Sequence, residues 1–271
     1  MVMKIECLHN KNEIEAFLRK NVCLHIYSIG DLDDFFWQDT QWYALKEDDE
    51  IQALALIYTG QRIPTLQALS VQADTMRKLL RSIWHILPGR FHAHLSPGVE
   101  EVFKGRYEME SCEKHYKMAL NSKRLPDSID CSQVVRMTED DLSQMLQLYE
   151  EAYPGNWFDP RMLQTKQYFG MKIDNKLVSV AGIHVYSKTY GVAALGNITT
   201  HPDFRDRGIA QSVTVRLCQS LLENVDHIGL NVKADNTAAI ALYEKLDFEI
   251  TALYYECMIF TPDVAEDLDF C

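Results

Sequence analysis

The feature that most constrains the fold is an apolar segment that stops at a proline and leads through a glycine into a helix. Residues 192–199 are apolar and β-compatible, and Pro202 ends the strand because its ring fixes φ and removes an amide donor. From Gly208 to about Glu223, apolar residues recur at helical spacing. The segment therefore predicts a strand, a turn and an amphipathic helix.

The turn between this strand and this helix has the chemistry of an anion site. The first amides of a helix lack partners within the helix, and the helix dipole adds positive potential there. Gly208 keeps the backbone accessible, Ala210 keeps the next turn small, and Arg205 and Arg207 add positive charge. Taken alone, this R-x-x-G-x-A pattern also fits an ordinary helix start with solvated arginines.

A second motif follows the first. Residues 227–232 form a strand-like run, and residues 236–248 have the pattern of a helix. Asn236 can cap this helix, and Tyr243 lies two turns further on. The combination of the turn and the second helix is more specific than either motif alone.

These two motifs, in this order and at this separation, resemble the acetyl-CoA site of the GCN5-related N-acetyltransferases (GNAT). That site combines an R/Q-x-x-G-x-G/A turn with a later N-x-x-A-x-x-x-Y helix, which this chain matches at residues 205–210 and 236–243. The resemblance covers residues 134–260. It implies an acetyltransferase that uses acetyl-CoA as its acyl-donor substrate and a primary amine as its acceptor.

The resemblance also implies roles for individual residues. The strand before the turn would diverge from its neighbour and pair with the pantetheine arm, and the amides of the turn would hold the pyrophosphate. Tyr243 would donate its phenolic proton to the CoA thiolate, although a tyrosine at such a position can also simply pack helix on sheet. The implied cofactor-binding residues are Ile198, Thr199, Thr200, Arg205, Asp206, Arg207, Gly208, Ile209, Ala210, Gln211, Asn231, Val232, Asn236, Ala239 and Tyr243.

The sequence does not identify a general base. Gly196 and Asn197 occupy the strand region where many relatives carry a glutamate. Each alternative also has a structural or solvated explanation, and in several relatives water carries the proton away. The candidates are His201, His184, Glu150 and Glu151.

Length and pattern indicate two domains. The chain has 271 residues, about twice what one such domain needs, and its first half repeats the order of strands and helices. The first half's strand-to-helix junction lacks the glycine and the arginines and carries Asp74, which would repel a phosphate. Val102 or Phe103 falls opposite Tyr243, so the ionisable hydroxyl is missing as well.

We therefore predict a mixed α/β (α+β) fold of two tandem GNAT-like domains. Each would be a mostly antiparallel, splayed sheet flanked by helices. The predicted ranges are a degenerate, non-catalytic domain at 1–122, a linker at 123–133 and a catalytic domain at 134–271.

Composition limits the partners and the compartment. A formal net charge of −12 argues against binding to nucleic acid or anionic membranes. The N-terminus lacks the apolar core of a signal peptide, and no apolar run reaches the roughly 18 residues of a membrane helix. The 7 cysteines show no C-x-x-C spacing, which indicates neither a disulfide framework nor zinc and favours a reducing cytoplasm. His92 and His94 would share a strand face but make an incomplete metal site.

The acceptor stays open at this level. A small-molecule amine is favoured, because the resemblance includes double-copy enzymes that acetylate such amines, and protein N-termini or lysines are the alternative. The aromatic loop at residues 153–158 lies where this fold builds its acceptor wall. A catalytically silent acyl-CoA-binding sensor or interaction protein is the competing class, and the intact turn with Tyr243 argues against it. A monomer is favoured over a homodimer.

Overall fold

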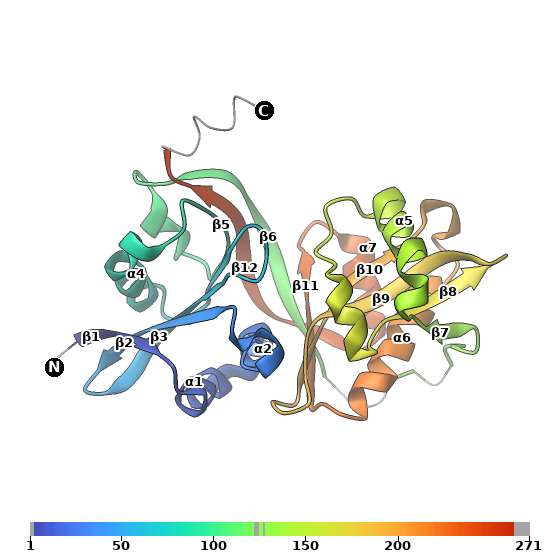
Figure 1. Cartoon of the computed structure of the whole chain (residues 1–271), viewed down its shortest axis with the longest axis horizontal. Coiled ribbons are helices and arrows are strands. Elements are labelled where there is room, and N and C mark those ends of the chain that lie inside the picture. The colour runs from blue at the N-terminus through green and yellow to red at the C-terminus, as the bar shows by residue number, and fades with distance from the viewer. Residues whose placement is uncertain (1–2, 122–124, 127, 263–271) are drawn as a thin grey trace. The chain divides into compact units, whose positions relative to one another are not determined.

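The computed structural model of the chain describes residues 3–121, 125–126 and 128–262. These residues form two compact units (Figure 1). Within the described residues, unit 1 consists of 3–117, 233–235 and 251–262, and unit 2 consists of 118–232 and 236–250.

The units divide the chain differently from the predicted domain ranges. Residues 251–262, expected in the C-terminal domain, belong to unit 1, because the strand that they contribute pairs with a strand of the first half. The predicted linker at 123–133 includes residues 123, 124 and 127, which lie outside the described residues. The descent of both units from one duplicated domain stays a prediction.

Unit 1 contains a sheet in which β1, β2, β3, β4, β5, β12 and β6 are neighbours in that order. Its helices are α1 (Lys11–Leu18), α2 (Val22–Gly30), α3 (Asp34–Trp37) and α4 (Ala73–Ser82). Its strands are β1 (Met3–Leu8), β2 (Thr40–Glu47), β3 (Glu50–Tyr58), β4 (Thr65–Ala68), β5 (Arg90–Leu95), most of β6 (Glu108–Leu120) and most of β12 (Phe248–Phe260).

Unit 2 contains neighbouring strands in the order β11, β10, β9, β8 and β7. Its helices are α5 (Leu142–Ala152), α6 (Ile209–Leu222) and α7 (Thr237–Lys245). Its strands are β7 (Val134–Arg136), β8 (Phe169–Ile173), β9 (Lys176–Ser187), β10 (Val192–Thr200) and β11 (His227–Lys233).

Both units pair their strands in the same way. From β1 to β5, three antiparallel pairings are followed by one parallel pairing, and the series from β7 to β11 repeats this pattern. In each series, a helix, α4 or α6, connects the two parallel strands, as a parallel pair requires. The prediction of a mixed, mostly antiparallel sheet with flanking helices is confirmed.

The core of unit 1 follows from strand alternation. Phe91, Ala93 and Leu95 of β5 are fully buried and belong to one cluster with Met76 and Leu79 of α4. The sequence pattern predicts one helix from Asp74 to Leu87, and this is wrong in its second half. Helix α4 ends at Ser82 because Ile83 leaves helical geometry at φ −107° and ψ 11°, and a short 3₁₀ turn, Trp84–Ile86, follows.

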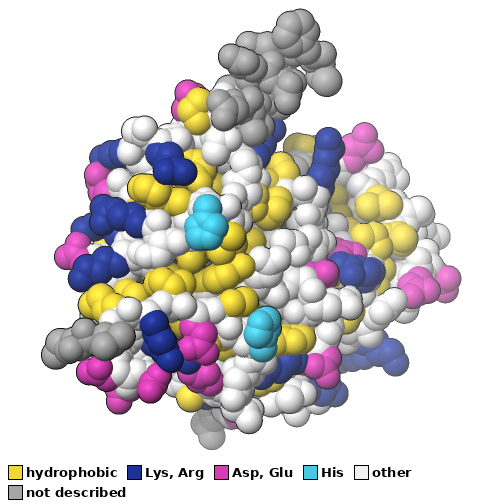
Figure 2. Space-filling model, turned by 60° about the vertical axis from the view of Figure 1, so that its left-hand side comes forward, with side chains coloured by type: hydrophobic (Ala, Val, Ile, Leu, Met, Phe, Trp, Pro, Cys, Tyr) yellow, Lys and Arg dark blue, Asp and Glu magenta, His cyan; other side chains and the backbone are white. Residues whose placement is uncertain are grey.

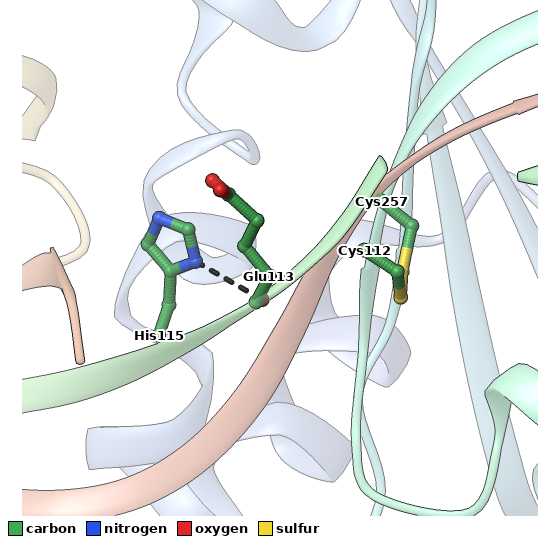
Figure 3. Close-up of a disulfide and its surroundings, with 4 residues drawn as sticks. All are labelled: Cys112, Glu113, His115 and Cys257. Carbon is green, nitrogen blue, oxygen red and sulfur yellow. Dashed lines mark hydrogen bonds between the residues drawn. A yellow bond between two sulfur atoms is a disulfide. The ribbon is translucent and has the colours of Figure 1, made fainter. Parts of the chain in front are cut away.

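A disulfide corrects the expectation drawn from the cysteines. Cys112 of β6 and Cys257 of β12 are bonded, with their Cα atoms 4.0 Å apart (Figure 3). The two strands are neighbours in the sheet, whereas the cysteines are 145 residues apart in sequence, so their spacing carried no signal. Glu113 and His115 project to the other side of β6.

The charge on one face of the molecule and the hydropathy of the described helices can be compared with those of membrane proteins. In the face shown in Figure 2, acidic and basic side chains are interspersed around hydrophobic ones. No helix in the described ranges combines the length and apolarity needed to cross a bilayer.

Candidate active site

Unit 2 contains an opening between its two parallel strands. β10 and β11 are paired from Val192 with His227 as far as Leu195 with Leu230. Beyond this point, β10 continues to Thr200 and β11 continues to Lys233 without further pairing to each other. The predicted divergence of the strand before the turn is therefore present, and it leaves backbone groups of β10 facing away from β9 without a strand partner.

A bulge in β10 lies within this opening. Gly196 pairs with Gly182 of β9 and Thr199 pairs with Val180, so Asn197 and Ile198 together oppose one residue. Asn197 has the left-handed φ of +53°, which asparagine tolerates better than most residues. Gly196 has no alternative, because a Cβ there would lie 2.1 Å from the His184 ring.

Buried polar side chains hold the bulge from the side of α5 and β9. The Tyr149 hydroxyl donates to the backbone carbonyl of Asn197 at 2.9 Å. The side-chain nitrogen Nδ2 of Asn197 donates to the Tyr168 hydroxyl at 3.1 Å. Tyr168 in turn donates to the Ile183 carbonyl at 2.8 Å, and Ser179 contacts the Thr199 carbonyl at 3.0 Å. Burial raises the pKa of both tyrosines, so both hydroxyls remain proton donors at neutral pH.

The predicted turn and helix are confirmed as local structure. Gly208 has a φ of +76°, and nothing lies within 4 Å of the position that its Cβ would take. Helix α6 begins at Ile209, and its first internal backbone hydrogen bond runs from the Ser212 amide to the Gly208 carbonyl. The amides before Ser212 thus have no partner within the helix, and they lie in the turn that begins beside the accessible Gly208.

The arginines of the turn are exposed but anchored. Arg205 Nε donates to the Thr200 carbonyl at 3.1 Å, and an Arg207 nitrogen donates to the Asp203 carbonyl at 3.0 Å. The Arg207 guanidinium also lies 5.2 Å from the centre of the Phe204 ring. Their charges stay at the turn, where the α6 dipole adds to the positive potential.

Tyr243 is buried on α7, and Asn236 caps this helix by accepting a hydrogen bond from the Ala239 amide at 3.1 Å. Burial raises the pKa of Tyr243 above its ordinary value, and nearby Tyr153 and Cys218 raise it further. Those two residues come from the end of α5 and from α6. In the described part of the chain, the Tyr243 hydroxyl makes no hydrogen bond, so its proton is available to a bound group.

Two of the base candidates, His201 and Glu151, contact each other. His201 Nε2 lies 3.2 Å from a carboxylate oxygen of Glu151, while its Nδ1 accepts a hydrogen bond from the Asp203 amide at 3.3 Å. Hydrogen bonds from Gln147 and Lys176 lower the pKa of Glu151. Because both imidazole nitrogens are engaged, this pair has the contacts of a structural tie between α5 and the end of β10.

The remaining base candidates, His184 and Glu150, differ in their surroundings. His184 packs its ring against Gly196 at the bulge, whereas Glu150 is exposed on α5. Among the other predicted residues, Asp206 and Asn236 are exposed, and Ile198, Ala210, Gln211, Asn231 and Ala239 are half-buried. Thr199, Thr200, Ile209 and Val232 are buried.

Comparison with known proteins identifies the family. The model of the acetyltransferase (GNAT) family matches residues 134–248. An acetyltransferase of Sodalis glossinidius is 35% identical over 118 residues, which are 41% of this chain and 82% of that protein. This chain belongs to the GNAT family of acetyltransferases.

A second relative and two solved structures extend the comparison. The alanine N-acetyltransferase of ribosomal protein bS18 from Salmonella typhimurium is 32% identical to this acetyltransferase over 113 residues, 40% of this chain and 74% of that one. A Drosophila protein of known structure has a TM-score of 0.70 at 12% identity. The match covers 96% of this chain and 99% of the Drosophila chain. A tandem GNAT protein from the clavulanic acid pathway has a TM-score of 0.56 at 12% identity, with coverages of 95% and 98%. The two structures share the fold over nearly the whole chain.

Unit 1 of the acetyltransferase buries a different set of polar groups. Gln67, His94 and Glu256 stand side by side in register across β4, β5 and β12. His94 Nε2 and His115 Nε2 lie 3.6 Å and 3.7 Å from one Glu256 oxygen, and Lys117 Nζ lies 4.9 Å from the ring centre of Tyr254. Within the described ranges, no group of three or more His, Cys, Asp or Glu is arranged to hold a metal ion.

Burial shifts the pKa values of this polar set. It lowers the pKa of His94 to about 4, that of His25 to about 3 and that of Lys117 to about 7. It raises the pKa of Asp31, which accepts a hydrogen bond from Gln67 at 2.8 Å, to about 7. Sequence reasoning singled out His94 only as half of an incomplete metal site. It missed His25, Asp31, Gln67, Lys117, Tyr149 and Tyr168, because each has the pattern of an ordinary core, helix or strand position.

Proposed function

We propose that the acetyltransferase transfers acetyl from acetyl-CoA to the primary amine of a small molecule, with Tyr243 as general acid. The observation that carries the proposal is the combination, in one unit, of an opened strand pair, an accessible Gly208 turn and a buried tyrosine with a free hydroxyl. The open space at Gly208 and the first amides of α6, which have no partner within the helix, fit a pyrophosphate, and Arg205 and Arg207 suit its charge.

The divergence of β10 from β11 supports a donor site between the two strands. The unpaired edge of β10, ending at Ile198, Thr199 and Thr200, offers peptide groups to an amide-bearing arm as an added strand would. Asn231 and Val232 lie on the facing strand, and Ala239 lies on the following helix. The proposed cofactor-binding residues thus lie on β10, the turn, α6, β11 or α7, with Asn236 at the N-cap of α7.

Acyl transfer requires one proton to leave nitrogen and one to reach sulfur. The amine nitrogen bonds to the thioester carbon and gives up its proton to water, the carbon–sulfur bond breaks, and the thiolate takes the Tyr243 proton, which solvent then replaces. A raised pKa keeps Tyr243 protonated at neutral pH. Burial also raises the pKa of the neighbouring Cys218 thiol to about 12, so this interior disfavours the ionised forms of both side chains.

A panel of acceptors tests the proposal by release of free CoA thiol. Small primary amines, including amino acids, are expected to turn over, and a matched set of tertiary amines is not. A peptide with an N-terminal alanine represents the second candidate, a protein amine, which the relative that acetylates ribosomal protein bS18 favours. Turnover of the peptide alone would replace the small-molecule proposal. Binding of acetyl-CoA without turnover of any amine would favour a sensor.

A further inference from the structure

The bulge of β10 depends on side chains outside the proposed donor site. Tyr149 holds the Asn197 carbonyl, and Tyr168 accepts from the Asn197 side chain while it donates to the Ile183 carbonyl. These three side chains are almost fully buried. The hydrogen bonds therefore form one continuous path from α5 through the bulge to β9.

Strand pairing alone fixes the bulge only weakly. On one side β10 has lost its pairing with β11, and on the other the register with β9 is interrupted between Gly196 and Thr199. Asn197 also has a left-handed φ of +53°, which asparagine tolerates but which departs from the extended backbone of a regular strand. Removing the two tyrosine hydroxyls would leave this backbone free to relax toward a regular ladder.

The same tyrosines contact the loop at residues 153–158. The Phe158 ring lies 5.1 Å from the Tyr149 ring and 5.4 Å from the Tyr168 ring, measured between centres. The loop is also stiffened by Asn156, which donates to the Tyr153 carbonyl and accepts from the Phe158 amide, both at 2.9 Å. One aromatic cluster thus touches both the bulge and this loop.

We propose that Tyr149 and Tyr168 are positioning residues for acyl transfer, which act through Asn197 to fix the β10 bulge and to align it with the loop at 153–158. This inference rests on the proposed function and deepens it. The bulge presents backbone groups to the donor thioester, and the loop borders the acceptor. A small shift between them misaligns the nitrogen and the thioester carbon, although the turn at Gly208 still holds the donor.

The test compares Tyr149→Phe and Tyr168→Phe with Tyr186→Phe in the full chain. Tyr186 is the control, because it lies on β9 opposite Ala193, outside the bulge, and its buried hydroxyl has no hydrogen-bond partner among the described residues. We expect each of the first two variants to lower kcat on the order of 10-fold, with KM for acetyl-CoA within about twofold of wild type. Amide hydrogen exchange at Ile198 and Thr199 should also become faster in these variants and not in the control.

A purely structural role would lower the melting temperature of Tyr149→Phe and Tyr168→Phe, which lose buried hydrogen bonds, without this split between kcat and KM. Equal kcat and equal exchange in wild type, Tyr149→Phe and Tyr168→Phe would overturn the proposal. Should either variant fail to fold, Asn197→Gly keeps the left-handed backbone and removes the hydrogen bond to Tyr168, and it is expected to lower kcat as well. A wild-type chain that acetylates no amine would instead contradict the proposed function, so the two failures are distinguishable.

Discussion

The two units share a topology and differ at the junction between a parallel strand and its helix. In unit 1, β4 stays paired with β5 as far as Ala68, its last residue. In unit 2, β10 leaves β11 after Leu195 and continues through a bulge to Thr200. The parallel pair β4–β5 is therefore closed at the end of β4, whereas the parallel pair β10–β11 is open at the end of β10.

The helices that follow also begin differently. Helix α4 follows Gln72 and carries Asp74 in its first turn, where Arg77 pairs with Asp74 and with the Gly98 carbonyl. Helix α6 follows the left-handed Gly208 and has no acid in its first turn. The Asp74 carboxylate offsets the positive potential at the start of α4, whereas no acidic side chain in the first turn of α6 does the same there. The comparison shows that the shared topology supplies the junction and that a few residues decide whether it can accept an anion.

The substitution Gly208→Trp is expected to remove the difference between the two junctions, because it would block the start of α6. We expect no measurable acetyl-CoA binding in calorimetry, because a side chain at a φ of +76° strains the backbone and covers the amides of α6. Gly105→Trp is a matched control, since Gly105 has a φ of +77°, also has nothing within 4 Å and lies in unit 1. Unchanged affinity in Gly208→Trp would show that the turn does not hold the donor.

Tyr243→Phe tests the chemical difference between the units. Turnover should fall by about 10²- to 10⁴-fold, because the thiolate loses its proton donor, while the affinity for acetyl-CoA stays near that of wild type. Tyr107→Phe serves as the control, since it removes a buried hydroxyl from unit 1. Stopped-flow detection of free thiol measures the effect, and a full rate in Tyr243→Phe would remove this residue from the mechanism.

The buried histidines of unit 1 make a separate prediction about pH. The imidazole of His94 has an ordinary pKa of 6.5 and a folded pKa of about 4, so only the unfolded chain takes up this proton between those values. The contribution of His94 to the free energy of unfolding is therefore fully present above about pH 6.5 and is lost as the pH falls toward 4. Urea unfolding at pH 7 and pH 5 should show wild type losing about 2 kcal/mol more than His94→Gln. An equal loss in both proteins would mean that His94 titrates normally.

Arg207→Ala is expected to have the smallest effect. The backbone amides of the turn would still hold the pyrophosphate, and Arg207 is exposed and bonded to the Asp203 carbonyl. We expect acetyl-CoA affinity to weaken by about 3- to 10-fold, with less weakening at high salt. Arg106→Ala, in unit 1, should leave the affinity unchanged. A loss as large as that of Gly208→Trp would mean that side chains and not amides carry the binding.

Local features could be predicted from the sequence. Strand β10, the turn at Gly208, helix α6 and the Asn236 cap are each determined by residues within a few positions of one another. The proline, the glycine and the helical period act through the backbone of their own segment.

Features that join distant segments could not be predicted in this way. The pairing of β12 with β5 and the bond between Cys112 and Cys257 join residues far apart in the chain. The contacts of Tyr149 and Tyr168 with Asn197 likewise depend on how α5 and β9 lie beside β10. A single sequence shows such aromatic residues only as apolar positions, so their polar role appears only in the folded chain.

The stoichiometry of acetyl-CoA binding tests the central claim most directly. Native mass spectrometry of the full chain, at donor concentrations above the affinity measured by calorimetry, counts the bound molecules. The account predicts one acetyl-CoA per chain in wild type and in Gly105→Trp, and none in Gly208→Trp. Two molecules per chain, or one that persists in Gly208→Trp, would contradict the claim that only unit 2 has a donor site.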